Sequence, residues 1–417
     1  MEEKTITSAV LVGMAENTAA SAAHQSSLDE LERLLETAGG VAFAKVLQIK
    51  SSFDPRTCIG SGKVLEIKAL CEANGIDLVI FDFELTAGQI RNLEEDMGGE
   101  IRVIDRSMLI LDIFALHATS GEGKLQVELA QLKYTAPRLM GQGKDLSRQG
   151  GGIGSRGPGE SKLESDRRHL KERIRALEAQ LAEMEHTRSI MRRQRDKSGL
   201  KKIAIVGYTN AGKSTLLNAL TDAGVLSENK LFATLDPTTR RLELPSGESV
   251  LLTDTVGFIR RLPHHLVEAF RSTLDEVRYA DILMIVADVS DPELSEQLVV
   301  TDEIIESLDA KDKPRIVVYN KCDSVEGLLC ADLRENAVAI SAKQGLGIDL
   351  LLSKVEDILH KQSRECELLF PYDAQSKLND LYRDYGILSS EYEADGTRVR
   401  ARLDEKGRGL FKKYIVE

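Results

Sequence analysis

The 417-residue sequence predicts an α/β protein in four parts: an N-terminal α/β domain, a long helical hairpin, a larger domain with a doubly wound parallel sheet, and a small C-terminal α+β domain. Short apolar runs alternate with amphipathic segments along most of the chain, as in parallel β-α-β units. A glycine-dense segment interrupts this alternation once, and a charged stretch free of Gly and Pro follows it. We therefore expect domains at 1–120, 121–198, 199–362 and 363–417.

The composition indicates a soluble globular protein. Hydrophobic residues make up 42% of the chain and charged residues 29%, which is ordinary for such proteins. No apolar run approaches the roughly 18 residues that a membrane helix needs, so no membrane partner is expected. The five cysteines include no C-x-x-C pair, which argues against zinc and favours a reducing, cytoplasmic setting.

The first domain is expected to contain four strands joined by helices. Its apolar runs, such as the buried run DLVIFD, predict strands at 8–14, 41–49, 77–82 and 101–104. The amphipathic segments between them predict helices at 28–37, 63–73 and 87–97. The sequence GSGK at 60–63 resembles a fragment of a phosphate loop but lacks its spacing, so an ordinary helix N-terminus is the better interpretation.

Residues 121–198 have the features of a helical hairpin. Helical periodicity extends from 124 to 139, and the segment 160–197 carries an apolar stripe at helical spacing. Eight glycines fall between them, within 141–159, a density that no packed element tolerates. Residues 121–200 hold 17 Lys and Arg against 11 Asp and Glu, a net charge of +6, whereas the rest of the chain carries −18. This asymmetry suggests an anionic partner, although a solvated helix of mixed charge has the same pattern.

The third domain is expected to be the doubly wound one. Its buried runs predict strands at 201–207, 249–253, 282–287, 316–319 and 337–340. In such sheets the ligand-binding loops follow the carboxyl ends of the strands. The remaining residues predict a strand, a helix at 374–385 and two alternating strands joined at Asp395-Gly396, which is a favourable hairpin turn.

The first of these strands leads into GYTNAGKS at 207–214, which matches G-x-x-x-x-G-K-[ST]. The backbone N–H groups of such a loop and the N-terminus of the next helix can bind phosphate oxygens. Lys213 can reach the β- and γ-phosphates, and the Ser214 hydroxyl can ligate Mg²⁺. A chance match on a strand–helix turn would be the alternative if this motif stood alone.

Three further motifs follow later strands in the order that a guanine nucleotide requires. Asp254 begins D-T-V-G, where a carboxylate holds the Mg²⁺ site and Gly257 can donate its N–H to the γ-phosphate. In N-K-C-D, Asn320 can bond to guanine N7 and brace the loop, and a buried Asp323 can accept from two guanine N–H groups that adenine lacks. In S-A-K, the Ala342 N–H can donate to guanine O6. Together the motifs predict an enzyme that hydrolyses GTP to GDP and phosphate with Mg²⁺ as cofactor.

Residues 207–343 resemble the GTPase domain of the translation-factor class. That class places a Mg²⁺-coordinating threonine before D-T-V-G, and the pattern F-x-T-L-x-P matches at Thr234, with Thr238 and Thr239 as the other candidates. Many GTPases orient the attacking water with a Gln after the D-x-x-G glycine. Phe258 stands there instead, so slow intrinsic hydrolysis is expected. Asn210 resembles the loop asparagine of GTPases that use K⁺, which makes bound K⁺ a further hypothesis.

These patterns define the expected nucleotide site. The residues expected to contact GTP are Gly207, Tyr208, Thr209, Asn210, Ala211, Gly212, Lys213, Ser214, Thr215, Phe232, Ala233, Thr234, Asp254, Thr255, Val256, Gly257, Asn320, Lys321, Asp323, Ser341, Ala342 and Lys343. The expected metal ligands are Ser214, Thr234 and Asp254, and the expected catalytic residues are Lys213, Thr234 and Gly257.

Three segments outside the nucleotide motifs resemble signatures of the HflX family, bacterial GTPases that bind the large ribosomal subunit. They are DPRTCIGSGKV at 54–64, VELAQLKYTAPRL at 127–139 and SRQGGGIGSRGPGESKLESDRR at 147–168. The resemblance covers essentially the whole chain. It implies a cytoplasmic protein associated with the 50S subunit and 23S rRNA, and GTP-linked dissociation of stalled or idle 70S ribosomes in the stress response. It also assigns Arg148, Arg156 and Lys162 to rRNA phosphates.

Two other functions fit parts of the sequence. The hairpin could dock a protein effector, which would make the chain a signalling GTPase, and steep salt dependence would distinguish RNA binding from apolar helix pairing. A GTPase domain could also gate separate chemistry such as RNA modification, but no Cys/His or metal constellation stands outside residues 207–343. A monomer in solution is expected.

Overall fold

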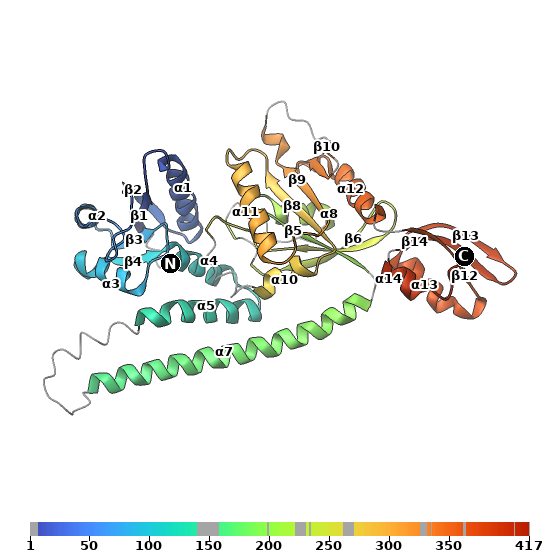
Figure 1. Ribbon diagram of the computed structural model, residues 1–417, viewed down its shortest axis with the longest axis horizontal. Coiled ribbons are helices and arrows are strands. Elements are labelled where there is room, and N and C mark those ends of the chain that lie inside the picture. Colours follow the sequence, from blue (N-terminus) through green and yellow to red (C-terminus); the bar gives the residue numbers. More distant parts are fainter. Residues whose placement is uncertain are drawn as a thin grey trace, which may run out of the picture. The chain divides into compact units, whose positions relative to one another are not determined.

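The computed structural model describes residues 7–139, 158–197, 200–221, 231–232, 235–261, 271–325, 332–334, 336–361, 364–403 and 405–416 (Figure 1). The chain divides into two compact units. The first comprises residues 1–184 with the short segments 230–232 and 260–270, and the second comprises 185–229, 233–259 and 271–417. In the part of the chain that is described, no helix has both the length and the apolar character of a membrane span.

A four-stranded parallel sheet forms the core of the first unit. Its order is β2-β1-β3-β4, with β1 (Ser8–Ala15), β2 (Val41–Ile49), β3 (Leu78–Phe81) and β4 (Arg102–Asp105). The connecting helices are α1 (Ser21–Thr37), α2 (Ser61–Asn74) and α3 (Ala87–Asp96). Each strand and helix predicted in this domain is present, because every predicted run has an apolar face to bury against the sheet. The GSGK segment begins α2, as an ordinary helix N-terminus does.

Three more helices belong wholly or partly to the first unit. The helix α4 (Arg106–His117) was not predicted, because its sequence SMLILDIFALH is apolar almost without interruption and has no helical period. Asp105 caps α4 by accepting a hydrogen bond from the Met108 N–H at 3.0 Å. The helices α5 (Gly121–Leu139) and α7 (Pro158–Lys197) are the two predicted for the hairpin. Arg148 and Arg156 lie outside the described residues, and only the backbone of Lys162 is described.

The second unit contains a seven-stranded sheet in the order β10-β11-β9-β8-β5-β7-β6. Five strands were predicted, namely β5 (Lys201–Val206), β7 (Ser249–Asp254), β8 (Ile282–Asp288), β9 (Arg315–Asn320) and β11 (Ala337–Ala339), and they are mutually parallel. The edge strands β6 (Thr238–Glu243) and β10 (Asp332–Arg334) are antiparallel additions that the apolar pattern did not indicate. The helices are α8 (Lys213–Thr221), α10 (Arg271–Tyr279), α11 (Leu294–Ser307) and α12 (Ile348–Lys361).

The C-terminal part has the predicted α+β composition. A three-stranded antiparallel sheet is ordered β12-β14-β13, with β12 (Arg364–Phe370), β13 (Ile387–Glu393) and β14 (Gly396–Leu403). The helices are α13 (Gln375–Asp384) and the short α14 (Glu405–Leu410). Two residues separate β13 from β14, and Gly396 has φ +154° at the start of β14. A Cβ on Gly396 would lie 2.2 Å from the Phe370 carbonyl oxygen, so only glycine fits where β12 approaches.

Candidate nucleotide site

The loop at 207–212 connects β5 to α8, as the motif requires, and two glycines determine its path. Gly207 has φ +143°, and a Cβ there would lie 2.1 Å from the Val286 carbonyl oxygen. Gly212 has φ +95°, and its Cβ would lie 2.3 Å from the Asn320 Nδ2. Both positions therefore need glycine for conformation and for space. The loop is thereby pressed against the carboxyl ends of β8 and β9, where ligands bind in doubly wound sheets.

Lys213 is buried at the start of α8, with 6% of its surface exposed. Its Nζ donates hydrogen bonds to the carbonyl oxygens of Gly207 at 3.2 Å and Tyr208 at 2.9 Å. Burial lowers the pKa of Lys213 to about 8, and the Asp254 charge opposes that shift. A buried cation with few anionic partners is suited to bind phosphate, because an anion would compensate for the lost hydration.

Ser214 and Asp254 lie together at the carboxyl end of β7. The Ser214 Oγ donates a hydrogen bond to the Asp254 Oδ2 at 2.6 Å, and Asp254 is fully buried. Hydroxyl and carboxylate oxygens are the hard donors that Mg²⁺ prefers, so this pair fits the predicted metal site. Thr234, the third predicted ligand, and Ala233 lie outside the described residues.

The D-T-V-G segment packs directly on the phosphate loop. The Thr255 Oγ1 donates to the Ile205 carbonyl at 2.7 Å, which fixes the end of β7 beside β5. A Cβ on Gly257 would lie 2.8 Å from the Thr209 Cα and 3.0 Å from the Lys213 Nζ. The sequence therefore needs glycine here, where the backbone approaches the lysine that is expected to hold phosphate.

Phe258 is paired through its backbone and buried through its ring. Its N–H donates to the Gly207 carbonyl at 3.0 Å, and its carbonyl accepts from the Thr209 N–H at 2.7 Å. Only 1% of Phe258 is exposed. The side chain therefore offers neither a polar atom nor an exposed surface to a water molecule, as its identity predicted.

Asn320 joins two of the predicted loops. Its Nδ2 donates to the Ala211 carbonyl at 2.9 Å, and its Oδ1 accepts from the Ala342 N–H at 3.0 Å. Asn320 thus links the phosphate loop to the loop that contains Ala342. The Ala342 N–H, which the sequence assigned to guanine O6, donates to this amide, because the Asn320 side chain reaches both loops at once.

The remaining guanine-site residues have partners that the motif alone did not indicate. The Lys321 Nζ lies 2.6 Å from the Asp288 Oδ2, and Asp288 ends β8. The Asp323 Oδ2 accepts from the Gln344 Nε2 at 3.3 Å, and Asp323 is exposed rather than buried. The carboxylate can disfavour adenine only if the bound nucleobase buries it, because only a buried carboxylate is costly to leave without a hydrogen-bond donor. In the sequence, Asp288 could be found as the polar residue that ends a buried strand, whereas no sequence pattern indicated Gln344.

The remaining predicted residues lie in two places. Tyr208, Ser341 and Val256 are buried near the carboxyl ends of the second unit's parallel strands, and Thr209 is 7% exposed. Lys343 is exposed. Phe232 belongs to the first unit, where its ring lies 4.7 Å from that of Phe114 at 84°. Among the described residues, no cluster of three or more His, Cys, Asp or Glu could form a separate metal site.

Three domain families match the chain in sequence. GTP-binding GTPase N-terminal matches residues 25–115, GTP-binding GTPase Middle Region matches 117–195, and 50S ribosome-binding GTPase matches 202–321. A crystal structure of a GTP-binding protein from the archaeon Sulfolobus solfataricus in complex with GDP is 26% identical, with a TM-score of 0.43 and coverage of 85% of this chain and 99% of that one.

Curated relatives match most of the chain. The GTPase HflX of Caldanaerobacter subterraneus is 48% identical over 392 residues, which cover 94% of this chain and 91% of the relative. The GTPase HflX of Escherichia coli is 41% identical over 375 residues, which cover 89% and 88%. With the nucleotide-binding motifs assembled on one sheet edge and full-length relatives at this identity, the chain belongs to the HflX family of GTPases.

Proposed function

We propose that this GTPase associates with the 50S ribosomal subunit and uses GTP binding to dissociate stalled or idle 70S ribosomes in the cytoplasm of stressed cells. The observation that supports this most is the helical hairpin. Its two helices flank a glycine-dense segment, and residues 121–200 carry a net charge of +6 in a chain of net charge −12. A basic, glycine-rich segment between two helices fits an RNA target better than an apolar protein groove.

The described part of the hairpin is built as a supporting stem. Arg173 donates to both Glu128 carboxylate oxygens, at 2.7 and 2.8 Å, and Lys133 lies 2.7 Å from Glu178. Leu177 on α7 is fully buried. These contacts use the α5-facing side of α7 for packing, so we assign RNA contact to the tip, with Arg148, Arg156 and Lys162 as the candidate contacts with 23S rRNA.

We assign the nucleotide roles to the residues that the motifs predicted. The backbone of residues 207–214 and the Lys213 ammonium would hold the phosphates, and the Gly257 N–H would point to the γ-phosphate. Ser214, Asp254 and Thr234 would hold Mg²⁺, which would neutralise phosphate charge when bound. Because the buried Phe258 ring cannot orient water, the ribosome or another group must complete the site, and basal hydrolysis is expected to be slow.

The domain assignment remains 1–120, 121–198, 199–362 and 363–417. The parallel sheet of 8–105 supports the first domain, and the separate antiparallel sheet of 364–403 supports the last. We assign the N-terminal domain and the hairpin to ribosome docking and residues 199–362 to nucleotide control of that docking, by ordering of the segments around Thr234 and Gly257.

GTP hydrolysis with and without purified 50S subunits tests the proposal. We expect at least tenfold stimulation, weakening steeply as salt rises. Charge reversal at the tip, Arg148→Glu with Arg156→Glu, should remove the stimulation and leave basal hydrolysis unchanged. Arg175→Glu, on an exposed part of α7, controls for net charge. Stimulation that survives the tip variant would contradict the assigned docking site, and no response to 50S would favour a signalling GTPase.

The K⁺ hypothesis has its own test. Asn210 has φ +62°, a left-handed conformation that asparagine tolerates better than most residues. If K⁺ takes part, replacing it with Na⁺ should slow hydrolysis with and without 50S, and Asn210→Ala should remove the difference. Equal rates in the two salts would rule out the role.

A further inference from the structure

Two short segments that flank the predicted switch residues belong to the first unit, although the sequence between them belongs to the second. Residues 231–232 precede Thr234, and residues 260–261 follow Gly257 by three positions. Both segments come from the part of the sequence that carries the nucleotide motifs. The first unit therefore holds the chain immediately beside two elements on which hydrolysis depends.

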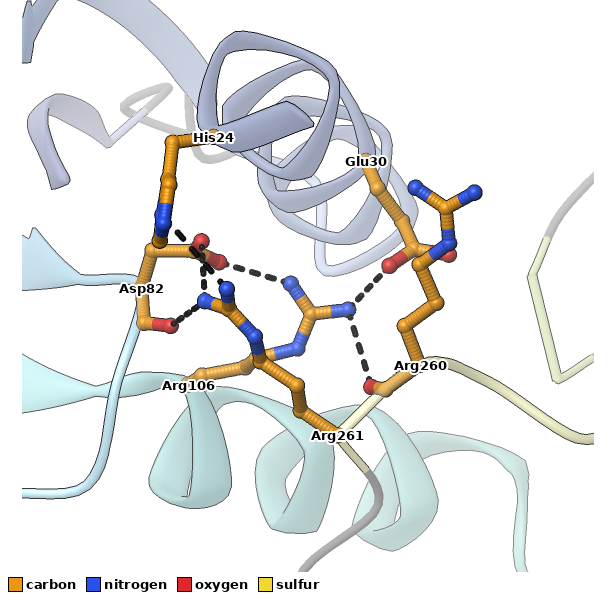
Figure 2. A network of polar contacts seen from close by, with 6 residues as sticks. All are labelled: His24, Glu30, Asp82, Arg106, Arg260 and Arg261. Carbon is orange, nitrogen blue, oxygen red and sulfur yellow. Dashed lines mark hydrogen bonds and ion pairs between the residues drawn. The ribbon is translucent and has the colours of Figure 1, made fainter. Parts of the chain in front are cut away.

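Arg106 is the centre of the contact with residues 260–261 (Figure 2). It is the first residue of α4 and is 2% exposed. Its Nη1 donates to the Asp82 Oδ1 at 2.7 Å, and its Nη2 bonds to the Glu30 carboxylate. The same Nη2 lies 3.3 Å from the Arg260 carbonyl oxygen and donates to it. A buried guanidinium is thus shared between the carboxylate of Glu30 on α1, the carboxylate of Asp82 after β3, and one backbone carbonyl of the segment.

Arg261 makes the second contact, also with Asp82 (Figure 2). Its Nη1 lies 3.3 Å from the Asp82 Oδ2 and 3.4 Å from the Asp82 carbonyl oxygen, and its Nη2 lies 3.4 Å from the His24 Nδ1. Asp82 is 1% exposed and follows β3 directly. With Arg261 in place, two carboxylates face two guanidinium groups. Without Arg261, the single positive charge of Arg106 would have to compensate the negative charges of both Asp82 and Glu30.

The segment 231–232 is held by apolar packing and one hydrogen bond. Phe232 is 2% exposed and sits edge-on to Phe114 of α4. The Leu231 N–H donates to the Thr37 Oγ1 at 3.3 Å. The helix α4 therefore contributes to both contacts, through Arg106 at its start and Phe114 near its end.

We infer that Arg106 and Asp82 slow basal GTP hydrolysis, because they hold the Arg260 carbonyl and the Arg261 guanidinium and so restrain the segment that begins at Gly257. Phe258 is tied to the phosphate loop by two backbone hydrogen bonds, and only the fully buried Ile259 stands between it and Arg260. A segment fixed at both ends rearranges slowly around the γ-phosphate, so releasing one end should speed hydrolysis. The inference depends on GTP hydrolysis alone and not on ribosome binding.

The test compares basal kcat and KM of the full chain, without ribosomes, for Arg261→Gln, Asp82→Asn and the double variant. Each single variant should raise kcat at least threefold with KM for GTP changed less than twofold. The double variant should add little more, because both changes break the same contact. Hydrogen–deuterium exchange of a peptide covering 258–261 should rise in parallel.

Two controls keep the test decisive. Arg56→Gln breaks an exposed ion pair with Asp96 in the same unit, at a side chain that is 55% exposed, and should leave kcat unchanged. Arg261→Lys should restore part of the restraint, because a lysine can still pair with Asp82. Arg261 is 46% exposed, so its loss should not unfold the chain as an Arg106 substitution could. An unchanged or lowered kcat in Arg261→Gln, or additive effects in the double variant, would overturn the inference.

Discussion

The buried Lys213 predicts an unusual dependence of stability on pH. The pKa of Lys213 is lowered from 10.5 to about 8, chiefly because the side chain is removed from water. The unfolded chain therefore binds this proton more tightly than the folded protein does. Keeping the charge in the nucleotide-free protein at pH 7 costs about 3 kcal/mol of unfolding free energy. This cost is fully present below pH 8 and disappears as pH rises through 10.5.

The variant Lys213→Met isolates this contribution. Between pH 7 and 9.5, the wild-type protein should gain about 2 kcal/mol of unfolding free energy relative to Lys213→Met, because the folded state loses its proton first. Urea unfolding followed by circular dichroism at several pH values measures the difference. Lys171→Met, at an exposed position on α7, is the control, and its unfolding free energy should vary with pH as that of the wild-type protein does. Parallel curves for wild type and Lys213→Met would mean that folding does not lower the pKa of Lys213.

Three further predictions follow from the described contacts. Gly212→Ala should weaken GTP binding at least 100-fold, since its Cβ would meet the Asn320 side chain at 2.3 Å, whereas Gly62→Ala, with open space around it, should bind GTP normally in the same fluorescent-nucleotide titration. Arg173→Ala should lower the unfolding free energy by less than about 1 kcal/mol, because its ion pair with Glu128 is exposed; a larger loss on urea unfolding would contradict this. The pKa of the Cys58 thiol is raised by burial to about 11, so Cys58 should react with a thiol reagent at pH 8 only after unfolding. Rapid native-state labelling of the peptide that contains Cys58 would show otherwise, whereas Cys366 is partly exposed and free to react.

The sequence predicted the parallel sheets well, because strands such as β1 and β8 are continuous apolar runs that are buried on both faces. Prediction from the sequence failed at α4, where a continuous apolar run forms a helix and not a strand. Apolar periodicity cannot separate a fully buried helix from a buried strand. It also missed β6, whose TTRRLE sequence gains its strand conformation by pairing with β7 and not from its own pattern.

The nucleotide motifs were predictable because each places a fixed residue type at a strand end. The hydrogen-bond partners of those residues were harder to predict from the sequence. Asn320 was expected to brace its loop, yet its bond with the Ala342 N–H depends on how two loops meet in space. The Arg106 network was invisible to the sequence, since Asp82, Arg106 and Arg261 are separated by up to 179 residues. Ion pairs between residues far apart in the chain produce no regular spacing in the sequence.

The most direct test of the proposed function is sedimentation of 70S ribosomes through a sucrose gradient after incubation with this protein and a nonhydrolysable GTP analogue. We expect the 70S peak to convert to 50S and 30S peaks, the protein to sediment with 50S, and GDP to have no such effect. An intact 70S peak with the protein remaining at the top of the gradient would contradict the proposed function.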